Sequence, residues 1–175
     1  KVTVDAWNNR APAGISRAIG YAVTGHNRRV EYSNGITEMY GNTERDDFLG
    51  MEGASDPAVD MFFCWNLDKE LTGIVMNVAC PSQVTEAKYY VSADYWGELR
   101  REMVKRFSED VIIFPQCSAA GDLSPRDLTK AYKSGEPNMW DVPGAVEIGR
   151  RLALVIDHAY IEAKDSIQTD IVFKH

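Results

Sequence analysis

The stretch VDMFFCWNLDKELTGIVMNVA, residues 59–79, decides the fold class of this 175-residue chain. Residues 59–65 and 73–79 are two apolar runs of strand length, and the polar residues 66–70 between them supply a turn. Short apolar runs bounded by turn residues are typical of buried strands. The stretch therefore predicts a hairpin of two buried strands.

Strands and helices alternate on both sides of this hairpin. Two helices are predicted, from Ser92 or Asp94 to Phe107 and from Pro143 to about Lys164, because each segment carries its apolar residues on one stripe at helical spacing. Four other segments have strand character: residues 1–7, 15–24, 110–115 and 168–173. This interleaving predicts an α/β, or mixed α+β, domain with a layered sheet and flanking helices, in which loops after strands carry the chemistry.

The two ends of the chain and one central segment bear on domain organisation. Residues 36–57 show little periodicity and many Gly, Asn and Asp residues, so we expect a long irregular loop. A strand at each end would leave two bare sheet edges, which native proteins usually avoid, and the first residue is Lys1. We therefore expect residues 1–175 to be a single domain segment, an incomplete piece of a larger catalytic domain or a chain that has lost a leader.

Composition limits the function classes. The chain is 45% hydrophobic and 26% charged, which is typical of a globular domain with one sizeable core. A net charge of -7 and a pI near 5.0 disfavour a nucleic-acid partner, because binding there requires neutralising phosphates. No apolar run approaches the ~20 residues that span a bilayer. We expect neither a nucleic-acid partner nor a transmembrane span.

Two polar segments are candidates for chemistry. In GDLSPR, residues 121–126, Ser124 is either a nucleophile or orienting hydroxyl, or the N-cap of a helix with Pro125 at its first position. In GHNRR, residues 25–29, a guanidinium can hold a carboxylate or polarise a carbonyl, and the imidazole can move a proton. Paired arginines are also ordinary on a solvated loop, so both interpretations of each segment stay open.

The cysteines form an odd and sparse set, which argues against a disulfide framework: Cys64, Cys80 and Cys117. Cys80 ends a predicted buried strand and lies fourteen residues before Asp94. It is either a core thiol or a metal ligand, although no Cys-x-x-Cys or His-Glu-x-x-His pattern supplies it with partners.

The order of these motifs along the chain resembles the N-terminal catalytic region of the neutral/alkaline, non-lysosomal ceramidase family. The succession is GHNR at 25–28, CPSQ at 80–83, SADYWG at 92–97 and GDLSP at 121–125. The last motif is the most specific, because that family carries Gly-Asp-x-Ser-Pro after a strand and a small-residue loop. The resemblance covers roughly residues 20 to 126.

This resemblance implies a metal-dependent amidohydrolase that acts on an N-acyl bond, such as the amide of a sphingolipid. Catalysis is then assigned to Ser124 and Arg28, and substrate binding to His26, Asp94 and Asp122. The alternative is a non-catalytic binding or structural relative of the family with a degenerate metal site.

The resemblance also implies zinc. Cys80 stands where the family has a zinc-binding histidine, so it is the candidate ligand. The family's other histidine, glutamate and tyrosine ligands have no counterpart in the 175 residues, so remaining segments of a parent polypeptide are expected to complete the site. Secretion or a membrane-facing location follows from the resemblance, whereas unpaired cysteines are equally compatible with the cytoplasm.

Overall fold

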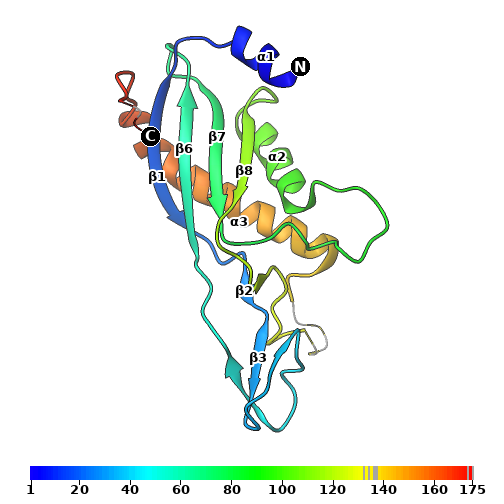
Figure 1. Cartoon of the computed structure of the whole chain (residues 1–175). Helices are drawn as coiled ribbons and strands as arrows, with labels where there is room; N and C mark the ends of the chain where they lie inside the picture. Colours follow the sequence, from blue (N-terminus) through cyan, green and yellow to red (C-terminus); the bar gives the residue numbers. More distant parts are fainter. Residues whose placement is uncertain (132, 134, 136–137, 173, 175) are drawn as a thin grey trace.

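The predicted hairpin forms the middle of a four-stranded sheet (Figure 1). Its strands are β6 (Ala58–Trp65) and β7 (Leu71–Val78). Outside them lie β1 (Gly14–Tyr21), antiparallel to β6, and β8 (Ile112–Cys117), parallel to β7. Since β1, β7 and β8 run in the same direction, their carboxyl ends meet at one end of the sheet. The structure is a computed structural model that describes residues 1–131, 133, 135, 138–172 and 174.

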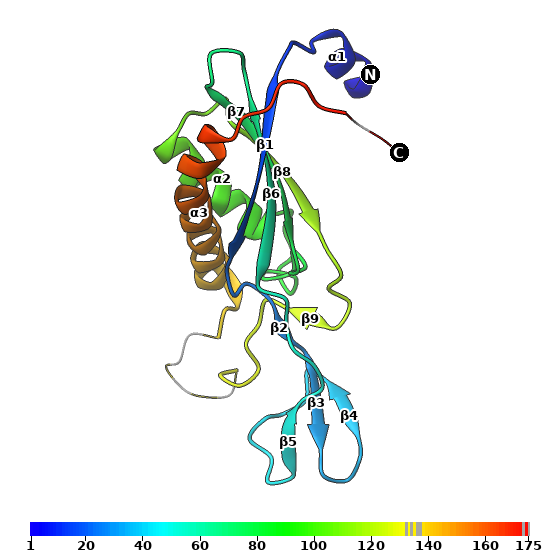
Figure 2. The same ribbon diagram turned by 90° about the vertical axis from the view of Figure 1, so that its left-hand side faces the viewer.

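Two helices cover one face of this sheet (Figure 2). They are α2 (Asp94–Arg106) and α3 (Asp141–Asp165), and both predicted helices are confirmed. A side chain on Gly149 of α3 would begin 2.9 Å from the backbone nitrogen of Leu99, so the missing side chain lets the two helices pack closely. The expected layered α/β architecture is therefore confirmed.

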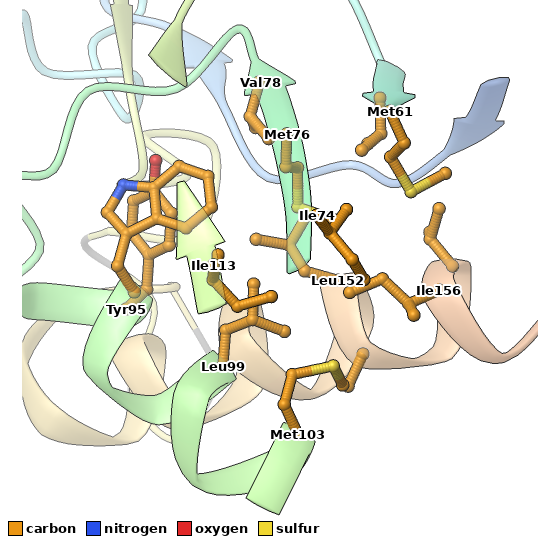
Figure 3. Packing of buried hydrophobic residues seen from close by; sticks show 14 of the residues in the cluster. Met61, Ile74, Met76, Val78, Tyr95, Leu99, Met103, Ile113, Leu152 and Ile156 are labelled. Carbon is orange, nitrogen blue, oxygen red and sulfur yellow. The ribbon is translucent and has the colours of Figure 1, made fainter. Parts of the chain in front are cut away.

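The main core lies between the sheet and the helices (Figure 3). Alternate residues of the two hairpin strands point into it, and the apolar stripes of α2 and α3 meet them. Its fully buried members include Met61, Phe63, Trp65, Ile74, Met76, Leu99, Met103, Ile148, Leu152 and Ile156. Full burial of one such side chain stabilises the fold by roughly 1.5–3 kcal/mol, so this layer holds the sheet end in place.

A small three-stranded sheet occupies the segment that we expected to be a loop. It contains β3 (Arg29–Tyr32), β4 (Thr37–Met39) and β5 (Phe48–Met51), in the order β4-β3-β5. The expectation of an irregular loop over residues 36–57 is thus wrong where β4 and β5 form. Strands of three or four residues, mostly partly exposed, are too short to show a periodic pattern.

Both predicted terminal strands are wrong. Residues 1–7 lie mostly in a short exposed helix, α1 (Val2–Asn8), which buries none of its residues. In 168–173 the only pairing among the described residues is a single bridge between Gln168 and Ile15, and residue 173 lies outside that description. The alternation of apolar residues needs a neighbouring strand to pair with, and these segments have none over their length.

Among the described residues no helix is long and apolar enough to cross a membrane.

Candidate functional site

The two polar motifs of the sequence meet in a two-stranded antiparallel ladder. One strand is β2 (His26–Asn27) and the other is β9 (Leu123–Ser124), with His26 directly opposite Ser124. The first strand follows the end of β1 and the second follows the end of β8, so the parallel direction of those strands brings both motifs to the same end of the sheet (Figure 1). Loops at the carboxyl ends of parallel strands are a common place for a binding site.

Arg28 is held against the second motif by several hydrogen bonds. Its backbone N–H donates to the carbonyl oxygen of Asp122 at 2.9 Å, and its Nη2 donates to that of Gly121 at 2.7 Å. Its Nη1 lies 3.4 Å from the hydroxyl oxygen of Tyr40. The Nε donor is buried and has no hydrogen-bond partner in the described part of the chain. The guanidinium is therefore fixed in direction while one of its donors is unsatisfied.

Asp122 joins the same cluster through its side chain. Its Oδ2 accepts a hydrogen bond of 2.9 Å from Nδ2 of Asn27, and the carbonyl oxygen of Asp122 accepts from the N–H of Arg28. The Asn27 side chain is buried and its Oδ1 accepts the backbone N–H of Arg29. Asp122 thus fixes the first motif from both its backbone and its carboxylate.

Ser124 is fully buried, and its Oγ accepts the backbone N–H of Arg126 at 3.2 Å. In the described chain no helix begins at Ser124, so its hydroxyl is not the N-cap of a helix. The hydroxyl instead caps a turn. Residues directly opposite in an antiparallel pair have their side chains on the same face. The Ser124 hydroxyl and the His26 imidazole therefore share one face of the ladder.

The hydrogen bond of His26 determines where its ring proton lies. Its Nδ1 is 3.1 Å from the carbonyl oxygen of Pro125, which only accepts, so Nδ1 carries the proton and Nε2 keeps a free lone pair. Burial lowers the pKa of His26, although the nearby carboxylate of Asp127 opposes the shift. The neutral ring lines two cavities, of about 500 and 360 Å³, and Asp127 lines both. His26 is thus a neutral base beside space for a ligand.

Cys80 follows β7 and contacts the segment before the ladder. Its Sγ donates to the carbonyl oxygen of Thr24 at 3.2 Å, and its own carbonyl accepts the hydroxyl of Tyr95 at 2.6 Å. A side chain on Gly25 would begin 2.5 Å from the carbonyl oxygen of Ala79, so these two segments are in close contact. Burial raises the pKa of the Cys80 thiol to about 12.

The described residues do not by themselves complete a zinc site. Zinc is ligated by a deprotonated cysteine together with two or three further ligands. In the metal-free chain, burial raises the pKa of the Cys80 thiol, and its Sγ donates to the carbonyl oxygen of Thr24. Within residues 1–131, 133, 135, 138–172 and 174, no group of three His, Cys, Asp or Glu side chains is placed to hold a metal ion.

Asp94 is not brought to the ladder by any described contact. Its Oδ2 accepts both the backbone N–H and the hydroxyl of Thr85, each at 3.0 Å, and its Oδ1 accepts the N–H of Tyr95. Its own N–H donates to Oγ of Ser92 at 2.9 Å. Asp94 therefore closes the loop between β7 and α2 at the start of the helix.

Two residues of the cluster were not predicted as site residues: Tyr40, and Arg126 at the end of the GDLSPR motif. The hydroxyl oxygen of Tyr40 accepts a hydrogen bond from Nη1 of Arg28 at 3.4 Å and another from Nε2 of Gln83 at 3.3 Å. Arg126 has a buried Nε with no partner in the described chain, and its guanidinium lies 5.4 Å from the ring centre of Trp140. Both belong to segments without periodicity, so only the folded chain shows their position.

Comparisons with known proteins bear on this architecture. No protein-family model matches the chain, and no curated protein is significantly similar to it in sequence. Two solved structures are similar in fold. Neutral ceramidase from Pseudomonas aeruginosa has a TM-score of 0.65 at 19% identity, over 97% of this chain and 26% of that one. A ceramidase complexed with C2 has a TM-score of 0.61 at 17% identity, over 91% and 24%.

These comparisons test the resemblance that the motifs predicted. The chain spans about a quarter of the length of each ceramidase structure, and at these identities the likeness concerns the fold. It extends over nearly the whole chain, beyond the region that carries the motifs. The chain therefore has the fold of a partial neutral ceramidase-like region.

Proposed function

We propose that this chain is the part of a ceramidase-like hydrolase that binds the N-acyl bond of a lipid amide. The observation that carries the proposal is the β2–β9 ladder, which pairs the Arg28 segment with the Ser124 segment although they are distant in sequence. The likeness to ceramidase structures supports the reaction class. Arg28 and Ser124 are assigned to the reacting bond, His26 beside them to proton transfer, and Asp122 to the wall of the site.

Arg28 has the properties required of an oxyanion-stabilising group. Attack on an amide carbonyl places negative charge on its oxygen, and a preoriented donor lowers the barrier by stabilising that charge. The guanidinium is oriented by the Gly121 carbonyl and the Tyr40 hydroxyl, and its Nε has no acceptor in the described chain. Because that Nε is buried, we assign the carbonyl oxygen of a bound amide to the Nη protons at the partly exposed end of the guanidinium.

Ser124 and His26 are assigned the proton-transfer chemistry. The hydroxyl of Ser124 attacks the carbonyl carbon, or orients the water that attacks it, and Nε2 of His26 accepts the proton released. His26 then returns this proton to the amide nitrogen as the C–N bond breaks and the amine leaves, and where Ser124 is the nucleophile a water molecule hydrolyses the resulting ester. Their shared face of the ladder and the neutral state of His26 support this assignment. Since the described residues do not complete a zinc site, we route no step through a metal.

A non-catalytic relative is the second candidate function. It is favoured by the burial of Ser124, whose Oγ is already bonded to the N–H of Arg126. It is also favoured by the protonated Cys80 thiol at the place of the expected metal ligand. In this case the ladder is a structural joint, and any ligand is bound without being cleaved.

Hydrolysis of a soluble, short-acyl amide of a sphingoid base distinguishes the two functions. The full-length polypeptide that carries this chain is assayed as wild type, Ser124→Ala and Arg28→Lys, with Ser118→Ala in the neighbouring loop as the matched control. We expect Arg28→Lys to lower kcat about 10²–10³-fold and Ser124→Ala to abolish turnover, with the control unchanged. Turnover at the wild-type rate in both Ser124→Ala and Arg28→Lys would contradict these assignments. If neither the wild type nor any variant hydrolyses the substrate, the result supports the non-catalytic relative.

A further inference from the structure

The segment between β7 and α2 projects from the body of the molecule (Figure 1). Its tip is the run Tyr89-Tyr90-Val91, in which Tyr89 and Val91 are fully exposed and Tyr90 is 55% exposed. No hydrogen bond joins these side chains to the described part of the chain. Single exposed apolar residues are common, but a consecutive run at a projecting tip marks a surface that contacts something else.

The base of this loop is firmly attached, so the tip is presented in a definite place. Nζ of Lys88 lies 2.8 Å from Oδ2 of Asp141, and the N–H of Asp141 donates to the carbonyl oxygen of Val84 at 3.1 Å. Thr85 is held by the carboxylate of Asp94, as described above. These contacts tie the loop to the first turns of both helices.

The same loop contacts the candidate site. Nε2 of Gln83 lies 3.3 Å from the hydroxyl oxygen of Tyr40, and Nη1 of Arg28 lies 3.4 Å from that same oxygen. One tyrosine therefore joins the base of the loop to the guanidinium assigned to the substrate. Whatever binds the tip is therefore attached to the same loop that contacts the candidate site.

We propose that residues 89–91 insert into the interfacial layer of a zwitterionic lipid bilayer and dock the protein where a lipid amide is held. This inference rests on the proposed function for the nature of the substrate. Tyrosine suits this position because its ring is apolar and its hydroxyl stays among the headgroups. Three residues at a tip are far fewer than the roughly 20 per side of a stable protein–protein interface, which favours lipid over a protein partner.

Charge indicates which lipid surface the tip fits. Lys88, which directly precedes the tip, is paired with Asp141, and Glu86 is bonded to Gln83. The whole chain carries a net charge of -7, which opposes approach to an anionic surface. Binding by apolar insertion alone is expected to favour phosphatidylcholine and to resist salt.

Flotation with pure phosphatidylcholine vesicles tests the inference on the 175-residue chain. Wild type is compared with the triple variant Tyr89→Ser, Tyr90→Ser, Val91→Ser, and with Leu67→Ser as the matched control. Leu67 is 64% exposed in the β6–β7 turn, at the opposite end of the sheet. We expect the triple variant to lower the vesicle partition coefficient about tenfold or more. We expect Leu67→Ser, and about 0.5 M salt with the wild type, to change this coefficient little, because apolar insertion does not depend on charge.

Several results would overturn the inference. They are an absence of wild-type flotation, equal flotation of the triple variant, or loss of flotation in Phe114→Ser on the open sheet face instead. Self-association of the wild type that the triple variant abolishes would show that the tip is a protein contact. Thermal unfolding by circular dichroism verifies that each variant is folded. Because these vesicles contain no amide lipid, the result is independent of hydrolysis of the soluble substrate.

Discussion

The Cys80 thiol gives the sharpest prediction, because its chemistry decides whether this end of the sheet holds a metal. Burial raises its pKa to about 12, against roughly 8.5 for a free cysteine. At pH 8 the thiolate fraction is then about 10⁻⁴ in place of about 0.2. Since only the thiolate is alkylated, folding is expected to slow the reaction of Cys80 roughly 2,000-fold, before its lack of access is considered.

Alkylation with iodoacetamide at pH 8, followed by mass spectrometry of the peptides, measures this factor. Each cysteine is compared in the folded chain and in guanidinium chloride, where the three thiols react alike. We expect Cys117, which is exposed, to be labelled quickly in the folded chain, and Cys80 to be protected about 10³-fold or more. Labelling of folded Cys80 within tenfold of its unfolded rate would refute the reasoning.

Zinc content provides the companion measurement. The chain and its Cys80→Ala variant, purified without affinity-tag histidines and incubated with zinc, are expected to contain the same amount of metal by elemental mass spectrometry. A thiol that donates to the carbonyl oxygen of Thr24 must lose its proton and this bond before it can bind zinc. One zinc per chain that disappears in the variant would establish Cys80 as a ligand and restore a metal-dependent mechanism.

Three further predictions concern residues around the site. Gly25→Ala places a carbon 2.5 Å from the Ala79 carbonyl and is expected to lower the free energy of unfolding in urea by roughly 1–3 kcal/mol, whereas an unchanged value would deny the close contact. Asp94→Ala, which removes three accepted hydrogen bonds from a buried carboxylate, is expected to cost about 1.5–3 kcal/mol in the same assay, and a smaller loss would mean that Asp94 does not hold the loop. Because folding lowers the pKa of His26, the unfolded chain binds more protons below pH ~6.5, so stability falls as the pH drops through that value towards the folded pKa. His26→Gln is expected to remove this part of the pH dependence, and an identical pH profile in the variant would contradict the neutral imidazole.

Elements whose own residues carry a periodic or continuous apolar pattern were predictable from the sequence. The hairpin of β6 and β7 and the two long helices bury their apolar stripes, and Leu99, Met103 and Leu152 are among the buried residues. Patterns of this kind survive folding because each element buries its own stripe against a neighbour. The pairing of the Arg28 and Ser124 segments agrees with what the family resemblance implies, and no periodicity in the sequence indicates it.

Elements that depend on distant partners were not predictable in this way. β2 and β9 contain two residues each and exist because the ends of β1 and β8 lie side by side. The alternation of Val2 and Val4 indicated a strand, yet no strand lies there to pair with it, and a short exposed helix forms. Tyr40, the contact between Arg28 and the projecting loop, has no pattern in its own segment to indicate its role.

The contacts of Cys80 connect two segments at this end of the fold. The carboxyl end of β7 lies against the segment that leads into β2, and β2 is one strand of the ladder on which the candidate site is built. In this chain a thiol hydrogen bond to the Thr24 carbonyl and the close approach of Gly25 to Ala79 connect them directly. Tyr95 secures the same strand end from α2 through its bond to the Cys80 carbonyl. These contacts join the end of β7 to the segment that leads into β2, so this part of the fold is held by contacts of the chain's own residues whether or not a metal binds.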